Sequence, residues 1–172
     1  MPREPATSAR GESQTSEREG AGPPPLRPFG LLLHHDGRWT HEGQPILNRR
    51  IREKFDRSVR YLPEQGKYVV QIGRFRGEIE VEEAGFFVRE FDPESGEVAL
   101  SDGGREALDI ASLTPSERDG ALLCRVKFEL AAGGLLARFS HAAQAEFMNA
   151  VEARGDRAAV RIAGELRPLP PL

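Results

Sequence analysis

One succession of elements occurs twice in this sequence: a short strand, a turn, a second short strand, an amphipathic helix and a longer strand. The first copy spans residues 39–72 and the second spans residues 128–162. A unit of this length buries too little apolar surface to be stable alone, so the two copies are expected to pack side by side and share an interior. The repetition therefore favours an α+β fold built of two strand-strand-helix-strand units.

The helix of the first copy is expected to begin after Asn48, because an asparagine side chain can accept a hydrogen bond from an unpaired amide of the first turn. Its apolar side chains recur at helical spacing and form one stripe. The stripe consists of Ile51, Phe55, Val59 and Leu62. Pro63 is expected to end the helix, since proline disfavours helical geometry in the residue before it. Residues 67–72 then have the β-branched and aromatic character of a strand.

The helix of the second copy has the same features. Ser140 is a good N-cap, and Phe147 and Val151 are four residues apart on one face. Gly155 is expected to end this helix, because glycine adopts the left-handed conformation without a Cβ penalty. Residues 158–163 then form the closing strand.

The N-terminal residues 1–26 differ from the rest of the chain. They are polar, interrupted by prolines and almost without apolar side chains, so they cannot offset the entropy of becoming ordered. We expect a disordered extension over 1–26, a first α+β repeat unit over 27–95 and a second unit over 96–172 packed on the first. Each unit is expected to place one helix on a mostly antiparallel sheet.

Composition excludes several classes of protein. The 172 residues carry a net charge of −3, which gives no basic excess for non-specific nucleic-acid binding. No apolar run approaches the roughly 20 residues that span a bilayer, and the polar N-terminus has no signal-peptide core. We expect a soluble, cytoplasmic protein with no membrane partner and no cofactor. The single cysteine, Cys124, lies in a strand-like run and is expected to be a buried structural thiol.

A cluster of polar residues at 34–42 is the strongest metal-ligand candidate. His34, Asp36, His41 and Glu42 carry the nitrogen and oxygen donors that bind divalent ions. Their spacing, however, does not match the helical motifs that hold two histidines on one face. The favoured interpretation is a polar turn with Asp36 and Gly37 at its centre. A metal site is the alternative.

Four residues are the candidates for ligand binding: Trp39, His41, Arg74 and Arg76. Trp39 is expected to be an amphipathic anchor over the edge of the core. Arg74 and Arg76 flank Phe75 in a glycine-bounded loop and could hold a phosphate, although the loop lacks the spacing of a nucleotide-binding loop.

The first predicted helix is rich in basic residues. They are Arg49, Arg50, Arg52, Lys54, Arg57 and Arg60. Such a helix could bind nucleic acid, but Glu53 and Asp56 interrupt the positive charge and allow local ion pairs. Nucleic acid is therefore the less favoured partner.

Several segments resemble one bacterial family. Residues 36–46 (DGRWTHEGQPI) have a Trp, a Gly and a Pro-Ile pair before the first helix, and 66–68, 79–86, 125–130 and 135–139 match later segments. Together they resemble the domain-of-unknown-function family twelve-eighty-five (DUF1285) over residues 29–166. In the segment 79–86, Glu83 and Gly85 replace an Asp and a Pro of the family pattern.

The resemblance implies an α+β fold of repeated motifs and no established activity, with signalling or ligand binding as the usual suggestion. Together with the absence of a catalytic constellation, it favours a non-enzymatic module that binds a small molecule or a protein, in signal transduction. Two alternatives remain: a metal-assisted hydrolase using the cluster at 34–42, and nucleic-acid binding through the helix at 49–60.

Overall fold

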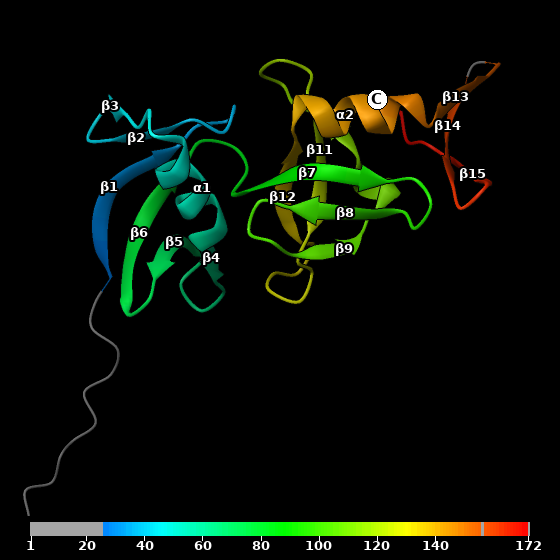
Figure 1. Cartoon of the computed structure of the whole chain (residues 1–172). Helices are drawn as coiled ribbons and strands as arrows, with labels where there is room; N and C mark the ends of the chain where they lie inside the picture. The colour runs from blue at the N-terminus through cyan, green and yellow to red at the C-terminus, as the bar shows by residue number, and fades with distance from the viewer. Residues whose placement is uncertain (1–25, 156, 172) are drawn as a thin grey trace, which may run out of the picture.

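The computed structural model describes residues 26–155 and 157–171, arranged as two six-stranded sheets, two helices and a small third sheet (Figure 1). The extension expected over 1–26 lies outside the described residues, except for Leu26. No helix in the described ranges is long and apolar enough to cross a membrane.

Sheet A is formed by the first half of the chain, in the order β3-β2-β1-β6-β5-β4. Its strands are β1 Arg27–Leu33, β2 Trp39–His41, β3 Gln44–Pro45, β4 Val59–Leu62, β5 Lys67–Ile72 and β6 Phe75–Val81. The central pair β1–β6 is parallel and the other neighbours are antiparallel. The β1–β2 turn contains Asp36 and Gly37, as predicted, and Gly37 donates its amide to the carbonyl of His34.

Helix α1 (Arg49–Ser58) crosses one face of sheet A. The Asn48 side chain accepts from the amides of Arg50 and Ile51, which confirms the predicted N-cap. The helix ends at Ser58, so the prediction that Val59 and Leu62 are helical was wrong. Val59 instead pairs with Val70 of β5, because β-branched and aromatic residues after Ser58 gain a strand partner there.

Sheet B has the strand order β10-β11-β12-β7-β8-β9. Its strands are β7 Phe86–Asp92, β8 Glu97–Leu100, β9 Arg105–Ala107, β10 Thr114–Pro115, β11 Leu122–Val126 and β12 Leu135–Phe139, with a 3-10 turn at Ile110–Ser112. Again the central pair, β12–β7, is parallel and its neighbours are antiparallel. Sheets A and B therefore share one pairing pattern.

Helix α2 (His141–Asn149) lies on β7 and β12 (Figure 1). Ser140 caps it by accepting from the amide of Ala143, as predicted, and the Phe147 side chain is fully buried. The helix ends before Val151 and not at Gly155, which corrects the predicted end. Val151 begins a separate antiparallel sheet C, made of β13 Val151–Arg154, β14 Arg157–Ile162 and β15 Glu165–Pro168.

The α+β class, the two similar sheets and the single helix on each are confirmed. Residues 82–85 join the last strand of sheet A to the first strand of sheet B. The expected unit boundary at residues 95 and 96 lies in the turn between β7 and β8, within sheet B. One cluster of buried apolar residues draws on both sheets. At the junction the ring of Tyr68 packs edge-on against Phe86, and a Cβ at Gly85 would lie 2.2 Å from the Tyr68 ring.

Candidate functional site

The four residues predicted to bind a ligand do not form one site. Trp39 is 1% exposed and packs at a tilt against Phe55 with 5.4 Å between ring centroids, so its ring is part of the core. His41 is exposed and borders an apolar groove beside α1. The guanidinium of Arg74 lies over the ring of Phe75, and Arg76 lies opposite Gln71 in the register of the β5–β6 hairpin.

Two of the metal candidates, Asp36 and His34, make hydrogen bonds within the β1–β2 turn and its strands. Asp36 accepts from the amide of Arg38 and pairs with its guanidinium at 2.6 Å. Burial alone would raise the pKa of Asp36, but these contacts with Arg38 together lower it. His34 Nε2 lies 3.1 Å from Thr40 Oγ1. Thr40 and His41 are neighbours on β2 and face opposite sides of the sheet. Among residues 26–155 and 157–171, no three His, Cys, Asp or Glu side chains converge as metal ligands.

Cys124 is fully buried in β11. Burial, followed by the charges of Glu106 and Asp109, raises the pKa of its thiol to about 12. The thiol therefore stays protonated and is a structural group, as the sequence predicted.

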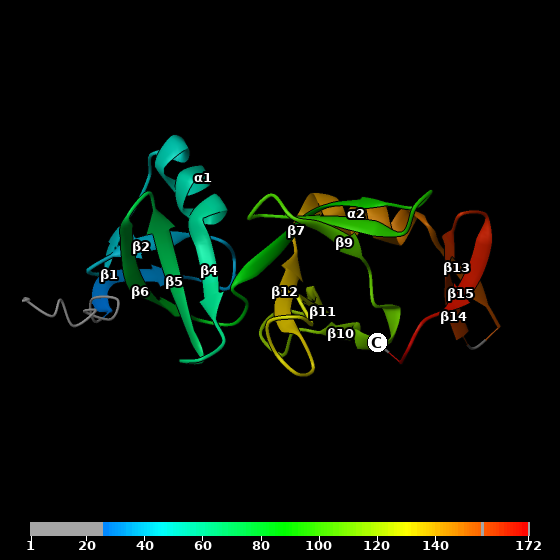
Figure 2. The same cartoon turned by 90° about the horizontal axis from the view of Figure 1, so that it is seen from below.

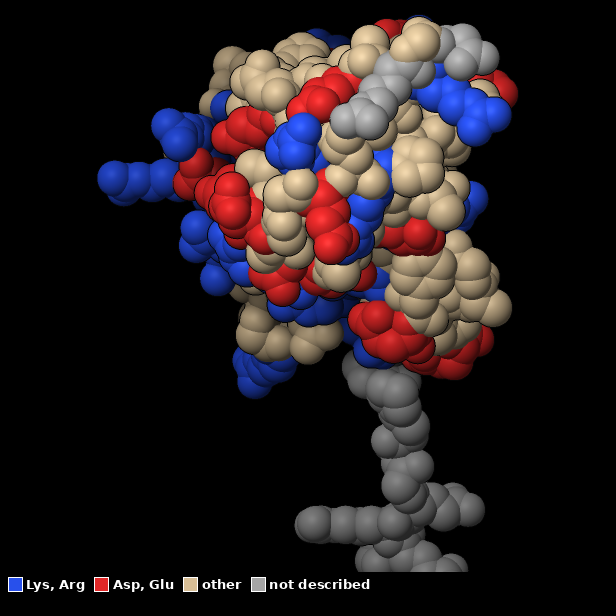
Figure 3. All heavy atoms as spheres, turned by 90° about the vertical axis from the view of Figure 1, so that its right-hand side faces the viewer, with Lys and Arg blue, Asp and Glu red and all other residues tan. Residues whose placement is uncertain are grey.

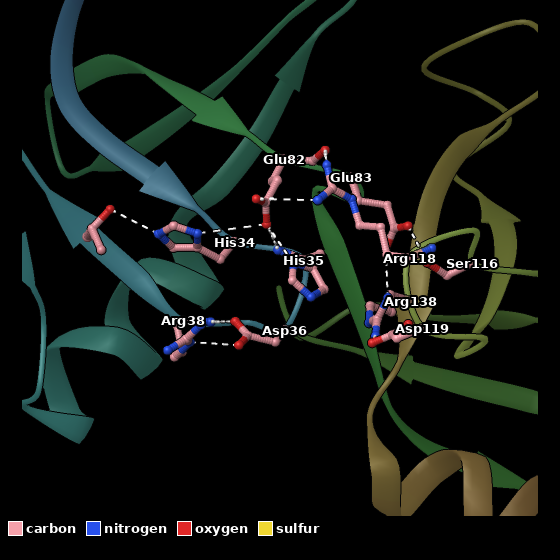
Figure 4. Close-up of polar contacts among 11 residues, drawn as sticks. His34, His35, Asp36, Arg38, Glu82, Glu83, Ser116, Arg118, Asp119 and Arg138 are labelled. Atoms are coloured by element: carbon pink, nitrogen blue, oxygen red, sulfur yellow. Dashed lines mark hydrogen bonds and ion pairs between the residues drawn. The ribbon is translucent and has the colours of Figure 1, made fainter. Parts of the chain in front are cut away.

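Glu82 ties the β1–β2 turn to the segment between the sheets (Figure 4). Its carboxylate accepts from the amide of His35 at 2.8 Å and from His35 Nδ1 at 2.6 Å, and Arg118 lies 3.5 Å away. These groups, the His35 amide foremost, lower the pKa of Glu82 to about 2. The segment that joins the sheets is thereby fixed to sheet A.

The adjacent Glu83 makes the matching connection to sheet B (Figure 4). Arg138 of β12 is 4% exposed and donates to Glu83 at 2.7 Å and to Asp119, while Ser116 donates to Glu83 at 2.5 Å. Burial alone would lower the pKa of Arg138, but the hydrogen bonds to Asp119 and Glu83 raise it. Because every group in this junction network is paired, we assign it a structural role.

A cleft of about 720 Å³ lies between α1 and sheet B, which face each other in Figure 2. Its charged lining is mostly arginine. The arginines are Arg38, Arg49, Arg52, Arg57, Arg89 and Arg105. The carboxylates are Asp36, Glu53, Asp56 and Glu90. Six guanidinium groups against four carboxylates leave a formal charge of +2, and we call this site the arginine cleft.

Four of the arginines have a carboxylate partner. Arg38 pairs with Asp36, Arg49 with Glu53, Arg89 with Asp56 and Arg105 with Glu90. Arg52 and Arg57 have no described carboxylate within ion-pair distance. Two positive charges of the arginine cleft are thus free to meet an anion.

Asp56 connects the arginine cleft to the core. Its Oδ1 accepts from the indole N–H of Trp39 at 2.9 Å, and its Oδ2 accepts from Arg89 of β7 at 2.7 Å. Burial raises the pKa of Asp56, whereas the Trp39 and Arg89 contacts oppose that rise. Any anion that competes for Arg89 would alter the environment of Trp39.

The sequence located only half of the arginine cleft. The arginine-rich segment predicts a basic helix that could bind nucleic acid. Nothing in the local sequence of Arg89 and Arg105 of sheet B shows that they face α1. Only the packing of the two sheets brings these arginines together.

Comparisons with known proteins support the fold. No protein-family model and no curated protein matches the sequence. A DUF1285 family protein from Silicibacter pomeroyi DSS-3 is similar in structure, with a TM-score of 0.57, 15% identity and coverage of 85% of this chain and 82% of that one. A second DUF1285 family protein, from Shewanella baltica OS155, has a TM-score of 0.48 and 16% identity, covering 71% of this chain and 91% of that one. The resemblance predicted from the sequence is thus confirmed in structure: this chain has the fold of the Silicibacter DUF1285 protein.

Proposed function

We propose that the protein is a non-enzymatic binding module whose arginine cleft takes a small anionic ligand. The observation that carries the proposal is the pair Arg52 and Arg57, two guanidinium groups in the cleft without a carboxylate partner. Guanidinium groups form charge-assisted, often bidentate hydrogen bonds with phosphate and carboxylate. A volume of about 720 Å³ suits a small molecule.

The chemistry of the lining favours binding over turnover. It includes one hydroxyl, that of Ser101, which accepts from the amide of Phe87 at 3.0 Å. The lining includes neither histidine nor cysteine, and its four carboxylates are each paired with an arginine. None of the described hydrogen bonds joins a carboxylate to the Ser101 hydroxyl, so no base is placed to activate it. A ligand that is bound and not converted is consistent with a part in signal transduction.

Nucleic-acid binding is supported less well. Three helix arginines face the arginine cleft, and Arg60 is engaged in donating to the carbonyls of Arg57 and Val59. Figure 3 shows the end of the molecule that carries sheet C, where acidic and basic side chains are interspersed, so this end offers no basic surface that would extend the arginines of α1. A cleft of about 720 Å³ between α1 and sheet B suits a small anion better than a duplex.

Phosphate, pyrophosphate and citrate, titrated into the whole protein, test the proposal. Calorimetry measures binding, and fluorescence of Trp39, the one tryptophan of the chain, reports on Asp56. The double variant Arg52→Ala/Arg57→Ala should weaken binding by at least tenfold, because it removes two charge-assisted contacts.

The matched control is Arg157→Ala/Arg167→Ala, which removes two exposed arginines from sheet C. It should bind with wild-type affinity. The proposal would be contradicted if none of the three anions produced heat or a change in fluorescence. It would also be contradicted if both double variants lost the same amount of anion affinity. Salt-sensitive binding of duplex DNA in place of the small anions would support the nucleic-acid alternative.

A further inference from the structure

A second site lies on the other side of α1. An apolar groove of about 430 Å³ runs between the helix and the face of sheet A that it only partly covers. Seven apolar side chains line it: Phe29, Leu31, Ile46, Ile51, Phe55, Val70 and Ile72. His41 is the one ionisable residue in this lining.

The groove is built into the sheet. Leu31 and Val70 are buried and form its floor. The ring of Phe29 lies directly on β6 because position 77 is glycine, and a Cβ there would lie 2.2 Å from the ring. Phe29 therefore forms a wall opposite α1 without filling the space between them.

Apolar side chains remain exposed at the mouth of the groove. Ile51 of α1 is 45% exposed although it lines the groove, and Leu47 just before the helix is more exposed still. Isolated exposed apolar residues are common, but here they continue a lined groove. An apolar occupant would cover Ile51 and remove this surface from water.

The chemistry beside the mouth indicates the other end of the occupant. Arg50 and Lys54 are exposed and four residues apart, and Lys54 is one turn from Ile51 on the same flank of α1. Like charges at this spacing destabilise a helix. Neither residue has a described carboxylate within ion-pair distance, so an anionic group between them would be stabilised.

We propose that this groove binds a single acyl chain whose anionic head group is held by Arg50 and Lys54. The volume lies within the range of small-molecule sites, and a lining that is apolar apart from one histidine suits a hydrocarbon. The acyl ligand is a soluble carboxylate or phosphate amphiphile. This site shares α1 with the arginine cleft but none of its lining residues.

Calorimetry of the whole protein with dodecanoate, below its micelle concentration, tests the proposal. Ile51→Asp should weaken binding at least tenfold, because it puts a carboxylate at the groove. Arg50→Ala/Lys54→Ala should weaken dodecanoate several-fold and leave binding of dodecyltrimethylammonium, with the same chain and a cationic head, no weaker. Ile51→Ser serves as a milder second variant if circular dichroism shows that Ile51→Asp is unfolded.

Met148→Asp is the matched control, since Met148 is 50% exposed on α2. It should bind dodecanoate like the wild type, as should the cleft variant Arg52→Ala/Arg57→Ala, which separates this site from the arginine cleft. Absence of dodecanoate binding, or a loss shared by Met148→Asp, overturns the proposal. Two further results would overturn it. In one, Ile51→Asp abolishes binding to anionic vesicles but leaves dodecanoate binding unchanged. In the other, Ile51→Asp converts a dimer to a monomer but leaves dodecanoate binding unchanged.

Discussion

Helices α1 and α2 occupy similar places in the two halves of the molecule and are used differently. Both are capped by a side chain that accepts from the first turn, and both lead into a three-stranded meander. The meander after α1 completes sheet A, whereas the meander after α2 forms sheet C. Helix α2 packs closely on sheet B through the buried Ala143 and Phe147.

Helix α1 buries only Ser58 completely and leaves a charged cleft on one side and an apolar groove on the other. Two copies of one fold can therefore present different surfaces. One copy of the helix closes a core, and the other provides two concave surfaces. The binding proposals therefore concern the first half, and α2 serves as an internal control.

The largest difference should appear when each helix loses its phenylalanine. Phe147→Ala removes a fully buried ring that contacts Phe91 and Phe139, and it should lower the free energy of unfolding by about 3–5 kcal/mol. Phe55→Ala removes a half-buried ring and should cost about 2 kcal/mol. Urea denaturation measures the free energy of unfolding of each variant. Equal decreases in the two variants would show that α1 and α2 contribute equally to the core.

The junction between the halves should be the next most sensitive region. Arg138→Met leaves Glu83 and Asp119 without their cation, so we expect a loss of about 3 kcal/mol in the free energy of unfolding. The exposed pair of Arg161 and Glu152 in sheet C is the comparison, and Arg161→Met should cost less than about 1 kcal/mol. A loss in Arg138→Met no larger than in Arg161→Met would remove the structural role assigned to the network.

Acid should weaken the same junction through Glu82. Its folded-state pKa, about 2, is below the ordinary value of 4.5, so its contribution is present above pH 4.5 and is lost as the pH falls toward 2. The urea midpoint of the wild type should therefore drop more between pH 5 and pH 3 than that of Glu82→Gln. Glu80→Gln, which changes an exposed carboxylate on β6, should keep the wild-type pH dependence.

The two N-caps should give the smallest effects. Asn48→Ala and Ser140→Ala each remove a side-chain acceptor from a first turn and should cost about 1 kcal/mol. Only Asn48→Ala should also weaken anion binding, because fraying of α1 displaces Arg49 and Arg52 from the cleft. Calorimetry that finds Ser140→Ala equally impaired would show that the cleft depends on global stability.

The parts of the fold that are local in sequence could be predicted. Asn48 and Ser140 marked the helix starts, and Asp36 with Gly37 marked the first turn. The helix ends could not be located, since Val59 and Val151 fit a helical stripe and a strand equally well. Val59 is in a strand because it pairs with β5, and Val151 is in a strand because it pairs with β14. These pairings join residues that are not neighbours in the sequence.

The candidate sites were less predictable for the same reason. The sequence showed an arginine-rich helix, yet it gave no sign that Arg89 and Arg105 lie across a cleft from it. The sequence predicts Trp39 as an amphipathic anchor at the edge of the core, but it does not show that the indole N–H of this buried residue donates to Asp56. That partner is seventeen residues away and is brought close by the crossing of α1 over the sheet.

By itself, the sequence determined the α+β class, the two capped helices, the buried thiol and the likeness to DUF1285 proteins. Three features depend on the packing of distant segments: the central parallel pair of sheets A and B, the formation of sheet C as a third sheet, and the separation of an arginine cleft from an apolar groove by α1. The physical reason is range: caps and turns depend on neighbouring residues, whereas clefts depend on which distant surfaces leave space between them when the core is packed.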